Sequence, residues 1–257
     1  MGAMKVAAFD FDGTLHHPGA GINPSDIAAI DAWRNAGHLA ISATGRSRSA
    51  LAYALRGSGL EFDYQVLSNG GSATDGANTE LVYGYQVDGA VLHTALDAFG
   101  EREGLAIFGT TLGRVDGVFA NNTGAAHTFT AHFEPMTRAA IPAHRFAVVP
   151  IWVPGNEALR AEVVEWAHTL DGVTVAQNQD YIDLMAPGRN KGAGVEELLA
   201  GIGVEPDQLI TFGDSWNDLT MHEIATVSHS FRHSPPEVQD ATDHVIGAVH
   251  EVLAGYL

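Results

Sequence analysis

The chain has 257 residues, of which 46% are hydrophobic and 17% charged, so it can form one large globular domain or two modest ones. Its formal net charge of −18 argues against nucleic acid and anionic membranes as partners, because both repel an acidic surface. No apolar run is long enough to span a membrane, and the absence of cysteine excludes disulfides, thiolate metal sites and cysteine nucleophiles. We expect a cytoplasmic protein that is a monomer or a homodimer.

The first 81 residues alternate between strand-like and helix-like segments. Asn23 and Pro24 suit the start of a helix that ends at Gly37, and a second helix is predicted over about residues 47–56. Three short apolar runs are typical of buried parallel strands: residues 5–9, 38–43 and 64–68. Such alternation predicts a doubly wound parallel sheet.

Residues 82–186 lack this alternation and predict an α+β insert. Helices are expected at about 88–102 and 157–170, and strands at 106–108, 115–120, 146–153 and 173–177. Pro150 has no backbone N–H and therefore indicates an edge strand or a bulge. The strand–helix rhythm then returns, with a strand over residues 208–212. We therefore expect a core domain of residues 1–81 and 187–257, interrupted by a second domain.

Acidic side chains follow two of the predicted core strands. Asp10 and Asp12 come directly after the first strand, and Asp214 and Asp218 follow the strand over residues 208–212. Ligands of open α/β sheets bind at the carboxyl ends of the strands, where these acids lie. Carboxylates gathered at one place require a cation or a proton, and oxygen ligands of this kind suit Mg²⁺. The first pair alone is equally well explained as a surface turn.

Two further segments place anion-binding groups next to helix starts. Thr44 and Gly45 end the second strand just before a helix, where free N–H groups can bind an anion. Thr44 or Ser47 would also serve as an ordinary helix cap. Lys191 opens a later helix and is one of only two lysines, with Lys5. A lysine beside several carboxylates offsets their repulsion and can bind a phosphoryl oxygen, although a single lysine is usually solvated surface.

Taken in order, four segments match the four motifs of the haloacid dehalogenase superfamily. They are Asp10-Phe11-Asp12-Gly13-Thr14-Leu15, Thr44-Gly45-Arg46, Asn190-Lys191-Gly192 and Gly213-Asp214-Ser215-Trp216-Asn217-Asp218. The insert between the second and third motifs resembles the Cof-type phosphatases, which carry a large α+β (C2-type) cap. Asn69-Gly70-Gly71 and residues 183–188 are also similar to that subgroup.

The resemblance implies a Rossmann-like core with an inserted cap domain. It also implies a phosphatase that hydrolyses a small phosphorylated metabolite, such as a sugar phosphate, through an aspartyl-phosphate. Asp10 would be the nucleophile, and Asp12 would protonate the leaving oxygen and then activate water. Thr44 and Lys191, with the Gly45 N–H, would hold the phosphoryl oxygens.

The resemblance also implies a Mg²⁺ cofactor with a defined set of ligands. The ion would bind to Asp10, to the backbone carbonyl of Asp12 and to Asp214. Asn217 and Asp218 would arrange the outer shell of the site.

Alternatives to a phosphatase remain open at this point. A sugar phosphomutase needs the same two aspartates, and a catalytically idle module that binds phosphorylated metabolites could retain the fold. Residues 226–237 depart from the glycine-rich strand and Gly-Asn-Ala turn of the subgroup, so the choice of substrate does not follow from the resemblance. Side chains of the insert could select the leaving group, although each is also explained as solvated surface: His93, His127, His132, His144, Arg102, Arg114, Arg138 and Arg145.

Overall fold

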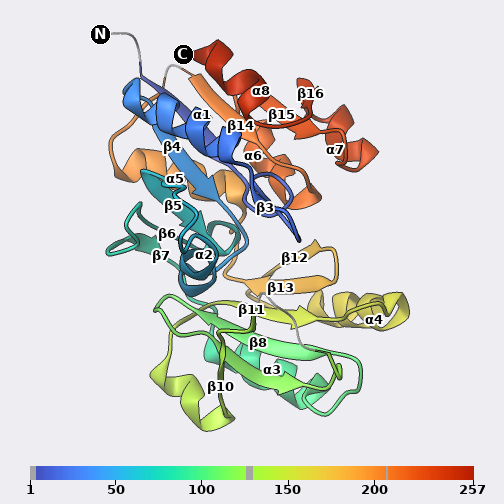
Figure 1. Ribbon diagram of the computed structural model, residues 1–257. Helices are drawn as coiled ribbons and strands as arrows, with labels where there is room; N and C mark the ends of the chain where they lie inside the picture. The colour runs from blue at the N-terminus through green and yellow to red at the C-terminus, as the bar shows by residue number, and fades with distance from the viewer. Residues whose placement is uncertain (1–3, 126–129, 207) are drawn as a thin grey trace. The chain divides into compact units, whose positions relative to one another are not determined.

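The computed structural model describes residues 4–125, 130–206 and 208–257 (Figure 1). The chain divides into two compact units. The core unit comprises Met1–Gly45, Leu55–Tyr83 and Asn190–Leu257, and the insert unit comprises Arg46–Ala54 and Gly84–Arg189. His127 of the candidate set lies outside the described residues. The predicted domain boundaries at residues 81/82 and 186/187 stay a prediction. Among the described residues, no helix is long and apolar enough to cross a membrane.

An eight-stranded sheet organises the core unit. Its strands, in spatial order, are β16 (His244–Ile246), β15 (Val227–Phe231), β14 (Gln208–Phe212), β1 (Lys5–Phe9), β4 (Leu39–Ala43), β5 (Tyr64–Leu67), β6 (Ser72–Asp75) and β7 (Leu81–Gly84). The pairings from β16 to β5 are all parallel, and β6 adds to β5 antiparallel. The chain continues from β1 to β4 on one side, whereas β14 lies on the other, so the strand order reverses at β1. Ligands of doubly wound folds bind at the carboxyl ends of the strands at such a reversal.

Helices cover this sheet, and two of them start at a side chain that caps the helix. They are α1 (Pro24–Asn35), α5 (Lys191–Gly201), α6 (Leu219–Glu223), α7 (Pro236–Asp240) and α8 (His250–Leu253). The Asn23 side chain accepts from the Ser25 N–H at 2.9 Å, as its predicted role as a cap requires. Asn190 caps α5 in the same way, from the Ala193 N–H at 2.8 Å. This second cap fixes the first residue of α5, which is Lys191.

A short hairpin follows β1 directly. It consists of β2 (His16–His17) and β3 (Gly21–Ile22), which pair antiparallel. Apolar side chains of β1, β4 and β5 pack against apolar side chains of α5. These side chains are fully or almost fully buried and include Val6, Ile41, Val66, Val195 and Leu198. The strand ends that carry the sequence motifs are therefore anchored by a solid core.

The insert unit contains a second sheet, in the order β10 (Glu134–Pro135), β9 (Gly117–Asn121), β8 (Ala106–Thr111), β11 (Phe146–Trp152), β13 (Tyr181–Met185) and β12 (Thr174–Asn178). Helices α3 (Gly89–Phe99) and α4 (Glu157–Ala167) pack on it through a cluster of buried apolar side chains. β11 lies in the interior of the sheet, so Pro150 is not on an edge strand. The register shift between β11 and β8 lies at Phe146–Val148, not at the proline.

Helix α2 (Arg48–Ala54) belongs to the insert unit, although β4 just before it belongs to the core unit. The Asp116 carboxylate accepts hydrogen bonds from the hydroxyl groups of Ser47 and Ser49, and its other oxygen accepts from the Thr111 N–H at 2.7 Å. Asp116 is almost fully buried, and burial raises its pKa above the ordinary value, against the opposing effect of these hydrogen bonds. These contacts, rather than local sequence, group α2 with the insert.

Candidate active site

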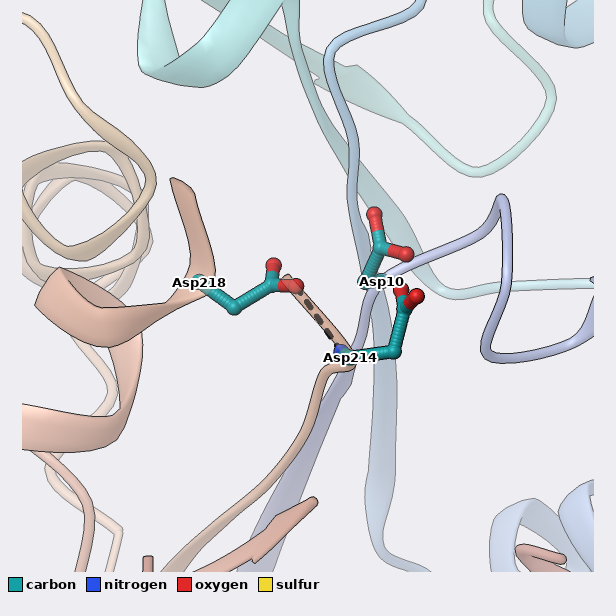
Figure 2. A group of neighbouring side chains, drawn as sticks. All are labelled: Asp10, Asp214 and Asp218. Carbon is teal, nitrogen blue, oxygen red and sulfur yellow. Dashed lines mark hydrogen bonds between the residues drawn. The ribbon is translucent and has the colours of Figure 1, made fainter. Parts of the chain in front are cut away.

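The carboxyl ends of β1 and β14 lie side by side, which brings the first and fourth motifs together. Phe9 pairs with Phe212, and the Asp10 N–H donates to the Phe212 carbonyl at 2.8 Å. Oxygens from Asp10, Asp214 and Asp218 all lie within 4.8 Å of one another. Figure 2 shows these three carboxyl groups gathered at the strand ends. The sequence prediction that the acids of the two motifs share one sheet edge agrees with this geometry.

Glycines allow the backbone to approach the acids closely. Gly13 has a φ of +93°, and a Cβ at this position would lie 2.3 Å from Asp214 Oδ2. A Cβ on Gly213 would lie 2.5 Å from the Asp218 Cγ. Any larger residue at either position would displace a carboxylate of the cluster.

Lys191 lies between two of the acids. Its Nζ donates to Asp10 Oδ1 and to Asp218 Oδ1, each at 2.6 Å, and all three side chains are buried. Burial alone would lower the pKa of Lys191, but the charges of Asp10 and Asp218 raise it above the ordinary value, so the ammonium stays charged. Asp218 Oδ2 also accepts from the N–H groups of Asp214 and Ser215, each at 3.0 Å, the first of which is drawn in Figure 2. Asp218 therefore holds both the lysine and the turn after β14.

Burial raises the pKa of the other two acids. The pKa of Asp10 lies well above its ordinary value because burial and the charges of Asp218 and Asp214 outweigh the attraction of Lys191. Burial, assisted by the charge of Asp218, raises the pKa of Asp214 to about 6. Carboxylates whose ionisation is disfavoured in this way are stabilised by a cation placed between them.

The donor set fits a hard divalent cation. When all three carboxyl groups are ionised, the cluster has two negative charges more than its one ammonium can balance. Asp214 Oδ1 and Asn217 Oδ1 are buried and have no hydrogen-bond partner in the described part of the chain. The Asn217 amide nitrogen donates instead to Asn69 Oδ1 at 3.2 Å, which fixes the orientation of the amide. Oxygen ligands with an excess of two negative charges are suited to Mg²⁺.

The Asp12 carboxylate is not a member of this cluster. Its side chain is 46% exposed, and Oδ1 lies 3.3 Å from His16 Nδ1. This placement is compatible with the predicted division of roles, in which only the backbone carbonyl of Asp12 contacts the metal. The prediction itself is not tested by the geometry.

Thr44 and Gly45 follow β4, on the other side of β1. Thr44 is buried, and its N–H donates to the Val66 carbonyl at 3.0 Å. A Cβ on Gly45 would lie 3.2 Å from Asn69 Oδ1. The second motif is thus held against the turn that begins at Asn69.

Two residues at the site were not among the candidates from the sequence. Asn69 has a left-handed φ of +51°. Its Oδ1 accepts a hydrogen bond from Asn217 and would also lie close to a Cβ on Gly45, so Asn69 lies between the second and fourth motifs. The Asn-Gly-Gly sequence after β5 was the signal that pointed to it. His233 lies in the segment that departs from the subgroup; its Nε2 is 2.9 Å from the Gly13 carbonyl and 3.8 Å from Asp214 Oδ2. No sequence pattern pointed to His233.

Three of the candidates of the insert contact side chains within the same unit. Arg102 pairs with Glu162 at 3.1 Å and Arg138 with Asp97 at 2.7 Å, all partly or largely exposed. His132 lies 3.1 Å from the Ser49 hydroxyl and stacks on Tyr53. These contacts do not gather the candidates into one site within the insert unit.

Comparison with known proteins places the chain in a family. The model of the haloacid dehalogenase-like hydrolases matches residues 7–254. A Streptococcus pyogenes protein, named as a bifunctional phosphatase/peptidyl-prolyl cis-trans isomerase, is 25% identical over 254 residues, which cover 96% of this chain and 52% of that protein. The chain thus spans about half the length of this relative. The HMP-PP phosphatase of Cronobacter sakazakii is 26% identical over 98% of this chain and 94% of its own length.

Solved structures share the fold over nearly the whole chain. A sugar phosphatase of haloacid dehalogenase subclass IIB superimposes with a TM-score of 0.82 at 20% identity, covering 98% of both chains. A haloacid dehalogenase-like hydrolase from Bacillus subtilis gives a TM-score of 0.83 at 16% identity, covering 98% of this chain and 100% of its own. The predicted doubly wound α/β core with an inserted α+β domain is confirmed, as is the resemblance to the Cof-type subgroup. The chain belongs to the haloacid dehalogenase-like hydrolase family.

Proposed function

We propose that this protein is a Mg²⁺-dependent phosphatase that hydrolyses a small phosphorylated metabolite, such as a sugar phosphate, through an aspartyl-phosphate. The observation that carries the proposal is the buried Asp10, which is held by Lys191 and lies beside Asp214 at the reversal of the sheet. A carboxylate in this position is fixed for attack on phosphorus, and the adjoining charges are suited to a phosphoryl group.

The reaction would proceed in two displacements. Asp10 attacks phosphorus, and the bond from phosphorus to the leaving oxygen breaks while Asp12 donates its proton to that oxygen. Asp12 then takes a proton from water, which attacks the phosphorus of the aspartyl-phosphate and releases phosphate and free Asp10. Lys191 and Thr44, with the Gly45 N–H, would bind the phosphoryl oxygens throughout.

A bound Mg²⁺ would neutralise charge on the transferring phosphoryl group. Asp10, the Asp12 carbonyl and Asp214 would hold it, with Asn217 and Asp218 in the outer shell. Two observations support this assignment. The buried oxygens Asp214 Oδ1 and Asn217 Oδ1 have no hydrogen-bond partner among the described residues, and the three carboxyl groups carry an excess of negative charge when ionised. Asp218 would act mainly through Lys191 and the turn after β14.

The substrate class is proposed from the relatives. They include an HMP-PP phosphatase and a sugar phosphatase, whose names indicate small phosphorylated substrates. A phosphomutase would use the same residues, so the two are separated by product. Phosphate release without formation of an isomeric phosphate ester supports hydrolysis, whereas isomer formation favours the mutase.

The test is release of phosphate from 4-nitrophenyl phosphate and from a panel of phosphorylated metabolites, with Mg²⁺ or with a chelator. We expect Asp10→Asn to reduce turnover by at least about a thousandfold, because it removes the nucleophile. Asp240→Asn, on the exposed end of α7, is the matched control and should be unaffected. Undiminished turnover in Asp10→Asn, or full activity in the chelator, would contradict the proposal.

A further inference from the structure

The chain after Asp10 folds back on itself within a few residues. The His16 N–H donates to the Phe11 carbonyl at 2.8 Å, and the Gly13 N–H donates to the His16 carbonyl at 2.9 Å. Asp12 and His16 also form an isolated β-bridge. His16 is therefore returned to the side of Asp12 by backbone hydrogen bonds that do not depend on its side chain.

The side chain of His16 is fixed from two directions. Its Nδ1 lies 3.3 Å from Asp12 Oδ1, and its ring stacks on the Phe11 ring with centroids 5.3 Å apart and an interplanar angle of 4°. Phe11 is fully buried, so it provides an immobile surface for the imidazole. The imidazole in turn lies against a carboxylate that is half exposed.

A carboxyl group that serves as a proton donor must be held in a suitable orientation, and contacts with neighbouring side chains provide this. General acid catalysis requires the proton to lie within hydrogen-bond reach of the leaving oxygen as the bond breaks. Because an ionised carboxylate only accepts, the imidazole donates from Nδ1 in that state. A donor held on a rigid ring restricts the rotation of the carboxyl group at Oδ1 and orients it.

We propose that His16 is a positioning residue for proton transfer by Asp12, a role that rests on the proposed phosphatase function. His16 touches neither the phosphoryl group nor the metal. It acts by holding the Asp12 carboxyl group where this group gives its proton to the leaving oxygen and later takes one from water. The motif in the sequence ends at Leu15, so no pattern assigned His16 a role.

The inference predicts a dependence on the leaving group. A basic leaving group, such as an alkoxide, needs a proton as it departs, whereas 4-nitrophenolate does not. The quantity to compare is kcat/KM, because it reports the steps up to departure of the leaving group and excludes hydrolysis of the aspartyl-phosphate. Two variants separate the features of His16: His16→Phe keeps a ring against Phe11 but has no donor, and His16→Asn keeps a donor near the position of Nδ1 but has no ring.

For His16→Phe we expect kcat/KM to fall about ten- to a hundredfold with an alkyl phosphate, part of the roughly 10²–10⁴-fold that acid–base catalysis contributes. With 4-nitrophenyl phosphate, kcat/KM should stay within about threefold, while kcat and KM fall together because activation of water is slower. His16→Asn should restore most of the loss with the alkyl phosphate. Thermal unfolding monitored by circular dichroism verifies that both variants are folded.

Three results would overturn the inference. If kcat/KM of His16→Phe falls equally for all leaving groups, His16 acts in phosphate binding or in structure. If kcat/KM falls with none of them, Asp12 does not need His16 for its orientation. A His16→Asn variant as impaired as His16→Phe would show that the donor is not the active feature. If the wild-type protein hydrolyses none of the series, the proposed function fails as well, so the two failures are distinguishable.

Discussion

Replacing Lys191 by Met should destabilise the core unit in a manner that depends on pH. Lys191 is the cation that lies 2.6 Å from both Asp10 and Asp218, and all three side chains are buried. Removing one partner of a buried ion pair typically costs about 3–5 kcal/mol, because it leaves an uncompensated charge. The loss should be smaller where the orphaned carboxylate can take up a proton.

The size of the effect follows from the cost of that proton. Protonating an aspartate of ordinary pKa, about 3.9, costs about 4 kcal/mol at pH 7 but only about 1.5 kcal/mol at pH 5. In Lys191→Met the pKa of Asp10 rises further in the folded state, so the folded state binds more protons than the unfolded state. Stability lost at pH 7 is then partly regained as the pH falls. We expect a loss of about 3 kcal/mol at pH 7 that shrinks to roughly half or less at pH 5.

The assay measures the free energy of unfolding of the core unit, by pulsed hydrogen exchange of peptides from β1 and α5 over a series of urea concentrations. A chelator is present so that no divalent cation replaces the missing charge. Asp10→Asn combined with Lys191→Met is the control. It removes one of the orphaned charges and should be more stable at pH 7 than Lys191→Met alone. A loss below about 1 kcal/mol at pH 7, or one of equal size at both pH values, would refute the electrostatic reasoning.

Three further predictions concern the same unit. Because the pKa of Asp214 is raised to about 6 without a cation, protons compete with Mg²⁺, so affinity measured by calorimetry should increase as the pH rises through 6; affinity that does not change between pH 5 and 7.5 would contradict this. Gly13→Ala places a Cβ 2.3 Å from Asp214 Oδ2 and should abolish Mg²⁺ binding in the same assay. If the variant binds Mg²⁺ as tightly as the wild-type protein does, this prediction is wrong. Burial lowers the pKa of His229 to about 4, below the 6.5 of an ordinary histidine, so the unfolded state binds more protons and up to about 3 kcal/mol of stability is lost as the pH falls from 6.5 to 4. The Tyr256 hydroxyl lies 2.9 Å from His229 Nε2, and His229→Gln keeps a hydrogen-bonding group for it. In urea unfolding, this variant should lose less stability than the wild-type protein as the pH falls, and an equal loss would exclude His229 as the source.

Features that a local pattern defines were predicted well from the sequence. β1 and β14 are short, mainly apolar segments that are buried after their first residue. The cap at Asn23 and the start of α5 at Lys191 follow from short-range hydrogen bonding. The grouping of the acids followed from one rule, that parallel strands end at the same sheet edge. These inferences need no knowledge of contacts between distant residues.

Features set by distant contacts were missed. β13 (Tyr181–Met185) lies inside the second sheet but was not predicted as a strand, because Asp183 interrupts its apolar residues. In the sheet, Asp183 pairs with Pro150 of β11. The hairpin of β6 and β7 was hidden by the Gly, Thr and Asn residues around it. The assignment of α2 to the insert unit depends on Asp116, which lies 67 residues from Ser49 in the chain.

The same limit applies to the candidate site. Asn69 and His233 contact the motifs only because of the fold, since both lie far along the chain from the residues that they contact. A local reading of the sequence identifies the groups that carry charge, because those are chemically distinctive. It does not identify the distant groups that contact them.

In the proposed reaction, Asp10 becomes phosphorylated during turnover. Asp12→Asn should accumulate this species when the substrate is an activated aryl phosphate, because departure of the leaving group needs no proton but hydrolysis of the aspartyl-phosphate needs a base. The measurement is an acid quench with radiolabelled substrate, followed by mapping of the labelled peptide. We expect label on the peptide that contains Asp10 and none when Asp10→Asn is added to the same chain. Continued phosphate release with no labelled protein, or label on another residue, would contradict it.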